Sequence, residues 1–217
     1  MAAEPWAVFA VLADVQYANK PPRVCENRER HYADAVDKLK RAVDLINKGP
    51  EVSFVVHLGD IIDGMPDEDA TMADLHRVLA AFSELNVQPV RHVLGNHCLE
   101  VPRPDLCRLL GLAEDRPYYS FVSGRCRIIV LDSVEVQVGR GADCEEHFIA
   151  QRFLEENAEL SYAKAYNGGV GDRQLQWLDA EVRHCTCGIP VLTTHAADRG
   201  RRSRSACHHL YAHPAGH

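Results

Sequence analysis

The stretch Val52-Ser-Phe-Val-Val-His-Leu-Gly-Asp60 decides the fold. Its apolar run is typical of a strand buried on both faces of a sheet, and it ends abruptly at a glycine and an aspartate. Similar apolar runs occupy residues 7–13, 87–94 and 189–194. Because segments with helical periodicity separate the first three of these runs, the pattern predicts an α/β fold with a largely parallel sheet and right-handed crossovers.

The remaining elements follow from periodicity and from turn residues. Apolar residues at three- and four-residue spacing predict helices, and two strand-like runs around Ser-Gly-Arg predict a β-hairpin. The predicted helices cover residues 30–47, 72–85, 145–160 and 172–184, and the hairpin pairs residues 118–122 with 126–131. We therefore expect one domain over residues 1–195, followed by a tail over residues 196–217.

Composition limits the partners. The 217 residues carry a formal net charge of −7, which argues against a nucleic-acid partner bound through its phosphates. No apolar run approaches the roughly 20 residues of a membrane span, and no positive charge precedes the first apolar run. The eight cysteines show no framework spacing, and the Cys185-Thr-Cys187 pair alone does not indicate a zinc site. We expect a cytoplasmic monomer with reduced thiols and no membrane partner.

Polar residues gather where the predicted strands end. The carboxyl ends of parallel strands line the crevice in which α/β proteins bind ligands. The residues that four strand ends bring there are Asp14, Gln16, Asp60, Asn96, His97 and His195. Carboxylates, amide oxygens and imidazoles suit Mn²⁺, Mg²⁺, Fe or Zn²⁺. Asp60, flanked by both other clusters, is the candidate bridge between two metals, which at about 3.5–4 Å apart would clamp a phosphoryl group.

Each of these residues also has a structural interpretation. An aspartate or asparagine after a strand is more often a turn or helix cap than a ligand. We interpret His57, which lies inside a predicted strand, as a packed core or sheet-surface histidine, and Asp63 as a residue that caps or shapes a turn. Three such clusters on successive strand ends nevertheless favour the metal site.

The motifs resemble those of the calcineurin-like metallophosphoesterase superfamily, whose signature is D-x-[HQ], G-D, G-N-H, H and G-H-x-H. The matching segments are Asp14–Gln16, Gly59–Asp60, Gly95–His97 and His195. Four further segments resemble one branch, the manganese-dependent ADP-ribose/CDP-alcohol diphosphatases. They are Ala13–Gln16, Leu58–Gly64, Arg28–Tyr32 and Asn167–Gly169 with Gln174–Leu178.

The resemblance implies a four-layer α/β/β/α sandwich and a hydrolase with two divalent metals, most readily Mn²⁺. It implies that ADP-ribose, CDP-choline or CDP-glycerol is split to AMP or CMP and a phosphomonoester. By the same resemblance, Asp14 and Gln16 hold the first metal, Asp60 bridges both metals, and Asn96 and His195 hold the second. His97 would contact the phosphate and stabilise the transition state or protonate the leaving group, with Arg28 and Arg30 as further phosphate contacts.

Two features depart from the family pattern. Cys98 follows the G-N-H motif where the family usually has glutamate, and no Gly-His-x-His follows His195. The tail instead carries four arginines within six residues, which favours a shifted frame or an alternative exon. Two other interpretations stay open: a short variant in which His208, His209, His213 or His217 replaces the missing pair, or a basic disordered extension.

These departures keep other functions open. Without the missing histidines and strands, the second sheet is expected to be incomplete and the activity impaired. One alternative is a non-catalytic protein that binds metal or nucleotide. Another is a metallophosphoesterase of a different branch, acting on cyclic nucleotides or phosphoproteins.

Overall fold

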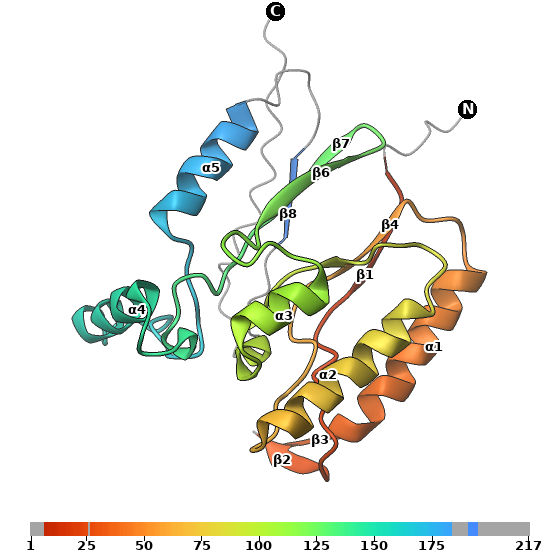
Figure 1. Cartoon of the computed structure of the whole chain (residues 1–217), viewed down its shortest axis with the longest axis horizontal. Coiled ribbons are helices and arrows are strands. Elements are labelled where there is room, and N and C mark those ends of the chain that lie inside the picture. Colours follow the sequence, from red (N-terminus) through yellow and green to blue (C-terminus); the bar gives the residue numbers. More distant parts are fainter. Residues whose placement is uncertain (1–6, 26, 184–190, 195–217) are drawn as a thin grey trace, which may run out of the picture.

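A computed structural model of the chain describes residues 7–25, 27–183 and 191–194 (Figure 1). The strands are β1 (Phe9–Leu12), β2 (Arg23–Cys25), β3 (Arg28–Arg30), β4 (Phe54–His57), β5 (Arg91–His92), β6 (Tyr119–Ser123), β7 (Cys126–Val130) and β8 (Val191–Thr194). The helices are α1 (Ala35–Lys48), α2 (Glu68–Ser83), α3 (Arg103–Leu110), α4 (Glu145–Glu156) and α5 (Asp172–Arg183). Three short 3-10 helices are η1 (Tyr32–Asp34), η2 (Asn96–Glu100) and η3 (Val138–Arg140).

The first sheet has the order β1-β4-β5 and is parallel throughout. Its central strand β4 is buried along its whole length, as its continuous apolar run predicts. Helices α1, α2 and α3 bury their apolar stripes against one face of this sheet, and Leu39, Leu75 and Leu106 belong to that core. The expected strand-helix-strand-helix-strand order is confirmed.

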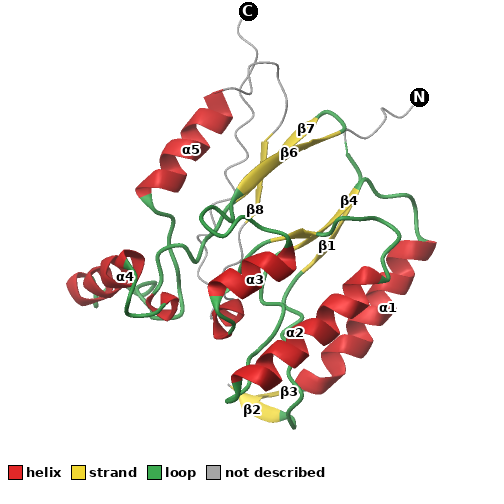
Figure 2. Cartoon of the chain, viewed as in Figure 1, coloured by secondary structure: helices red, strands yellow, loops and turns green. Residues whose placement is uncertain are grey.

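The second sheet joins the hairpin β6–β7 to β8, which pairs with β7 in parallel. A second core lies between the two sheets and contains Phe54 and Val56 of β4 together with Ile128 and Val130 of β7. Helix α5 covers the outer face of this sheet, where Glu181 accepts hydrogen bonds from Ser120 and Arg127. The layers are therefore helices, sheet, sheet and helix, which is the expected α/β/β/α sandwich (Figure 2).

Three predicted elements have different bounds in the structure. The first helix begins at Ala35 rather than at residue 30, because residues 28–30 form β3 in a hairpin with β2. The third strand is reduced to Arg91–His92, since Pro89 in the predicted run has no N–H to donate to a neighbouring strand. Helix α3 was not predicted from periodicity, although Pro104 near its start and Gly111 in left-handed conformation after its end (φ 67°) are typical boundary residues.

Two expectations fall outside the described residues. The predicted tail over residues 196–217 and the strands missing from the second sheet cannot be compared with the structure. Within the described ranges, no helix has the length and apolar character that crossing a membrane requires.

Candidate metal centre

The loops that follow β1 and β4 run side by side and bring the first two clusters together. The backbone N–H of Asp14 donates to the carbonyl of Gly59 (3.3 Å), and that of Gln16 donates to the carbonyl of Asp60 (2.9 Å). One residue further, Tyr17 forms a parallel bridge with Ile62. These loops are more than 40 residues apart in the sequence. The parallel pairing of β1 with β4 places them side by side in the fold.

Asp60 lies at the centre of the site with only 2% of its surface exposed. One carboxylate oxygen accepts from the backbone N–H of His97 (3.0 Å), and the other from the amide nitrogen of Gln16 (3.4 Å). Burial raises the pKa of Asp60 above its ordinary value, whereas the nearby His97 lowers it, and the Asp14 carboxylate raises it further. A buried carboxylate beside a second carboxylate creates the negative potential that a cation would neutralise.

Strained backbone marks the same residues. Among the described residues, the non-glycine positions with positive φ are Asp14, Gln16, Asn27 and Asp60. Three of these four are expected metal ligands, with φ values between 42° and 54°. Such conformations cost about 1–3 kcal/mol each and persist where the surroundings over-determine them, which is typical of functional sites.

Gly95 lets the third strand end approach Asp60. A Cβ atom at position 95 would lie 2.2 Å from an Asp60 carboxylate oxygen and 2.6 Å from the Asp60 backbone nitrogen. Only glycine therefore allows the G-N-H segment to pass close enough for the His97 N–H to reach Asp60. Asn96 begins η2 directly after this contact.

His97 is held by a carboxylate that the sequence reasoning missed. Its Nδ1 lies 3.2 Å from Oδ1 of Asp63, and the ammonium of Lys20 pairs with the other oxygen of Asp63. Lys20 also donates to the carbonyl of Gly64 (3.2 Å) and lies 4.3 Å from the centre of the Tyr32 ring. Asp63 was interpreted only as a turn residue. Its position three residues after Asp60, on the same loop, was the available signal.

Cys98 fills space rather than carrying charge. Its side chain is fully buried in the core of the first sheet. Burial raises the pKa of its thiol to about 11, so the group stays neutral at physiological pH. The glutamate that the family usually has at this position would place a charge in the same apolar surroundings.

The donor set fits a divalent cation. No three His, Cys, Asp or Glu side chains come together as a metal cluster in the part of the chain that the structure describes. Two of the expected ligands, Gln16 and Asn96, are amides, and their oxygens with the carboxylates of Asp14 and Asp60 form the oxygen-rich set that Mn²⁺ and Mg²⁺ prefer. His195 follows the last residue of β8 and lies outside the described residues.

The two arginines expected as phosphate contacts lie in a β-hairpin rather than at the start of a helix. Arg28 and Arg30 are exposed in β3, opposite Cys25 and Arg23 of β2, and do not begin a helix. A cavity of about 380 Å³ lies along the segment Leu99–Arg103, which follows His97 in the chain, and its lining also includes Met65 and Arg140. In the sequence, Met65 comes two residues after Asp63, and Leu99 comes two residues after His97.

The fold is a two-sheet sandwich whose strand ends carry carboxylates, amides and a histidine. The sequence pattern of the calcineurin-like phosphoesterase family matches residues 7–180. The chain belongs to this family.

Several relatives share one name. A protein from Arabidopsis thaliana named manganese-dependent ADP-ribose/CDP-alcohol diphosphatase is 34% identical over 202 residues, covering 84% of this chain and 64% of its own length. A protein of the same name from Oryza sativa is 35% identical over 195 residues, covering 81% and 60%. The chain thus spans less than two thirds of the length of these relatives.

A solved structure supports the fold. The crystal structure of a dimetal phosphatase from Danio rerio superposes with a TM-score of 0.78 at 30% sequence identity. The match covers 88% of this chain and 70% of that one.

Proposed function

We propose that the chain is a metal-dependent phosphoric anhydride hydrolase that cleaves ADP-ribose and CDP-alcohols such as CDP-choline and CDP-glycerol. The products would be AMP or CMP and a phosphomonoester. One observation carries the proposal: the buried Asp60 carboxylate is held between Gln16 and His97, in a chain of the calcineurin-like phosphoesterase family. The shared name of the relatives supports the choice of substrate and of manganese.

The ligand roles follow the strand ends. Asp14 and Gln16 would hold one metal ion, Asp60 would bridge two, and Asn96 with His195 would hold the second. Bound divalent metals would polarise the scissile phosphoryl group as Lewis acids and lower the pKa of water at the site. The protein's own contribution is to keep the Asp60 carboxylate fixed before substrate arrives, through the His97 N–H and the Gln16 amide.

His97 would act on the phosphoryl group. Asp63 lies against Nδ1 at 3.2 Å, which orients the ring and leaves Nε2 as the nitrogen for substrate. Lys20 fixes Asp63 from its other side, so the carboxylate cannot rotate away without breaking an ion pair. Nε2 can then donate a hydrogen bond to a phosphoryl oxygen or a proton to the leaving group.

The cavity of about 380 Å³ along the segment Leu99–Arg103 is large enough for part of a nucleotide. Arg103 and Arg140 contribute positive charge to its lining, while Glu68 and Glu100 contribute negative charge. This mixture suits a polar substrate with both phosphate and sugar hydroxyl groups. We place the portion of the substrate beyond the scissile phosphate there.

The decisive assay is Mn²⁺-dependent release of AMP from ADP-ribose or CMP from CDP-choline, with Asp60→Asn as the control. Turnover that this substitution abolishes supports the hydrolase. Tight Mn²⁺ binding without turnover would instead identify a non-catalytic binding protein. Turnover of cyclic nucleotides or phosphoproteins alone would assign another branch of the family, and failure to retain any metal would refute every metal-dependent function.

A further inference from the structure

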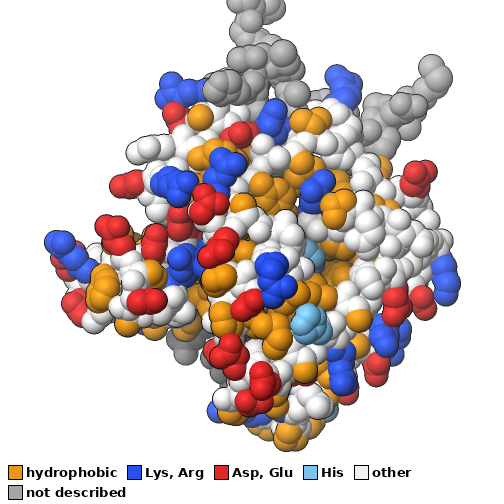
Figure 3. Space-filling model, in the orientation of Figure 1, with side chains coloured by type: hydrophobic (Ala, Val, Ile, Leu, Met, Phe, Trp, Pro, Cys, Tyr) orange, Lys and Arg blue, Asp and Glu red, His pale blue; other side chains and the backbone are white. Residues whose placement is uncertain are grey.

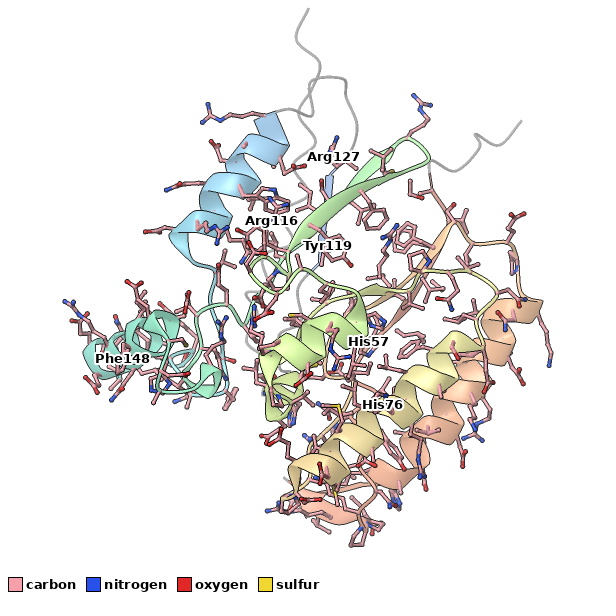
Figure 4. All side chains as sticks on the ribbon, viewed as in Figure 1. His57, His76, Arg116, Tyr119, Arg127 and Phe148 are labelled. Carbon is pink, nitrogen blue, oxygen red and sulfur yellow. The ribbon has the colours of Figure 1, made fainter. Side chains whose placement is uncertain are left out.

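A second cavity, of about 230 Å³, lies at the amino end of β5, whereas Asn96 follows the carboxyl end of that strand. Its lining includes Arg91 and His92 of β5, and Tyr119 at the start of β6. Arg116 and the segment Leu110–Ala113 after α3 complete the wall. We call it the arginine cavity. Figure 4 labels Arg116 and Tyr119 close together near the amino end of β6, and Figure 3 shows both basic and acidic side chains around apolar ones on the face in view.

The charged residues that line the arginine cavity are both basic, and the carboxylate of Asp115, beside Arg116, acts on the lining residue Tyr118 from outside the wall. Arg91 and Arg116 both line it, and none of its lining residues is an aspartate or a glutamate. Neither guanidinium forms an ion pair or a side-chain hydrogen bond with any residue in the described ranges. Elsewhere in the described chain, arginines at similar depth pair with carboxylates, as Arg103 does with Asp132 and Arg127 with Glu181.

Arg91 is held in place without a counterion. Its guanidinium lies over the ring of Phe121, 4.4 Å from the ring centre, and its Nε is buried without a hydrogen-bond partner. Arg91 is half-exposed, so its guanidinium keeps contact with water, and stacking on an aromatic face offsets part of the cost of burying Nε. Among the described residues the Arg91 guanidinium has no anionic partner, and its open side is available to an anion.

The other polar groups of the cavity are neutral. Burial raises the pKa of Tyr119 to about 12, and its hydroxyl donates to the backbone carbonyl of His92 (3.0 Å). Burial lowers the pKa of His92 to about 4, so the imidazole is uncharged at neutral pH, and its Nδ1 has no hydrogen-bond partner. The two guanidinium groups are therefore the charged groups of the wall, and they favour a negatively charged ligand.

We propose that the arginine cavity binds a small oxyanion of the phosphate class, either orthophosphate or the terminal phosphate of a monoester. Guanidinium groups bind phosphate oxygens through paired N–H donors, and two of them match a dianion. The volume is several times the roughly 30 Å³ of one water molecule, yet below the roughly 300 Å³ at which pockets for larger ligands begin. This site is separate from the metal centre and does not depend on the proposed hydrolase activity.

The test is a calorimetric titration of the metal-free full-length protein with orthophosphate, at constant ionic strength set with NaCl. We expect saturable binding of one phosphate per chain. Arg116→Gln should weaken it about tenfold or more, because hydrogen bonds to charged groups contribute about 1.5–3 kcal/mol. Arg91→Gln should have the same effect. Since Arg116 is exposed, its substitution tests the proposal even where the Arg91 variant fails to fold.

Two controls separate this site from other causes. Arg41→Gln removes the same charge from the exposed face of α1 and should leave binding unchanged. Asp60→Asn should also leave it unchanged, because the metal centre is not involved. The proposal is overturned by the absence of saturable binding, by equal affinity in the Arg116 variant and the wild type, or by loss of binding in the Asp60 variant alone. Equal affinity for acetate would refute the assignment to phosphate.

Discussion

Two buried histidines make the stability of this protein depend on pH. His57 and His92 lie next to each other on β4 and β5, with ring centres 5.9 Å apart, and the ring of Phe82 packs against both. Both are almost completely buried, and among the described residues the nitrogens Nδ1 and Nε2 of His57 and Nδ1 of His92 have no hydrogen-bond partner. Because no described residue compensates a positive charge there, both rings are expected to be neutral in the folded protein.

The size of this pH-dependent loss of stability follows from the pKa values of the two histidines. Burial lowers the pKa of His92 from 6.5 to about 4, and burial, with a smaller effect of His92 when it is protonated, lowers that of His57 well below 6.5. Above pH 6.5 both histidines are neutral in the folded and the unfolded chain, and they do not affect stability. Between pH 6.5 and about 4, the unfolded chain takes up protons that the folded chain does not, so stability falls as the pH falls. For His92 alone the full loss is ~3 kcal/mol, of which ~2 kcal/mol is reached at pH 5.

The assay is urea unfolding at pH 7.5 and pH 5.0, with wild-type protein compared with His92→Phe. Phenylalanine keeps an aromatic ring against Phe82 but cannot take up a proton. We expect the wild type to lose ~2 kcal/mol more than the variant between the two pH values. His76→Gln serves as the control, since His76 is exposed on α2 and its replacement should leave the pH dependence unchanged (Figure 4).

One result would refute this reasoning. If wild type and His92→Phe lose the same stability between pH 7.5 and 5.0, the imidazole is not held neutral in the fold. A change in the urea m-value would instead show that the comparison is no longer between the same two states.

Three further substitutions test the site and the packing around it. Gly95→Ala should abolish Mn²⁺-dependent turnover and lower the free energy of unfolding by about 1–3 kcal/mol, because its Cβ would collide with Asp60; activity and urea unfolding measure this. Asp63→Asn should lower kcat by about 10- to 100-fold with a smaller change in KM, since His97 loses its orienting carboxylate. Gln174→Ala should destabilise the fold by about 1–3 kcal/mol in thermal unfolding, because this fully buried side chain ties α5 to Asp132 and Glu135 in the loop after β7.

Each of these three substitutions has a matched control variant. At Gly169, an added Cβ would meet its nearest atoms only at 3.8 Å, so Gly169→Ala should leave activity and stability intact. Lys20→Met removes the partner of Asp63 but keeps the carboxylate beside His97, and should lower kcat less than Asp63→Asn does. Gln176→Ala on the exposed face of α5 should leave thermal stability unchanged. Equal effects in a variant and its comparison would contradict the assigned contact.

The sequence predicted those parts of the molecule that follow from local patterns. The apolar run before Gly59 is typical of a buried strand, and strand ends of a parallel sheet meet at one edge, so the positions of Asp14, Gln16 and Asp60 in the chain suffice to bring them together. His57 was correctly predicted to be a core residue. These predictions succeeded because periodicity can be read from neighbouring residues, and because the topology of a parallel sheet follows from a few general rules.

The errors lie where tertiary contacts override local patterns. Residues 28–30 have no apolar side chain to signal a strand, and only pairing with residues 23–25 makes them one. The role of Asp63 depends on where its loop directs the carboxylate, which no spacing rule gives. The uncompensated charge of Arg91 was equally invisible, because an unpaired arginine is recognised only from what surrounds it.

The strained backbone and the buried charge at the metal centre have one explanation in common. Asp14 and Asp60 hold positive φ angles, and burial and mutual repulsion disfavour the ionised form of Asp60. Both features lower stability, yet the β1–β4 register and the Gln16-to-Asp60 backbone hydrogen bond keep them in place. A fold that maintains unfavourable conformation and charge at the same residues is preorganised for a ligand that compensates both. A divalent cation would do so, because it would neutralise the two carboxylates and use the geometry that the strained backbone imposes on them.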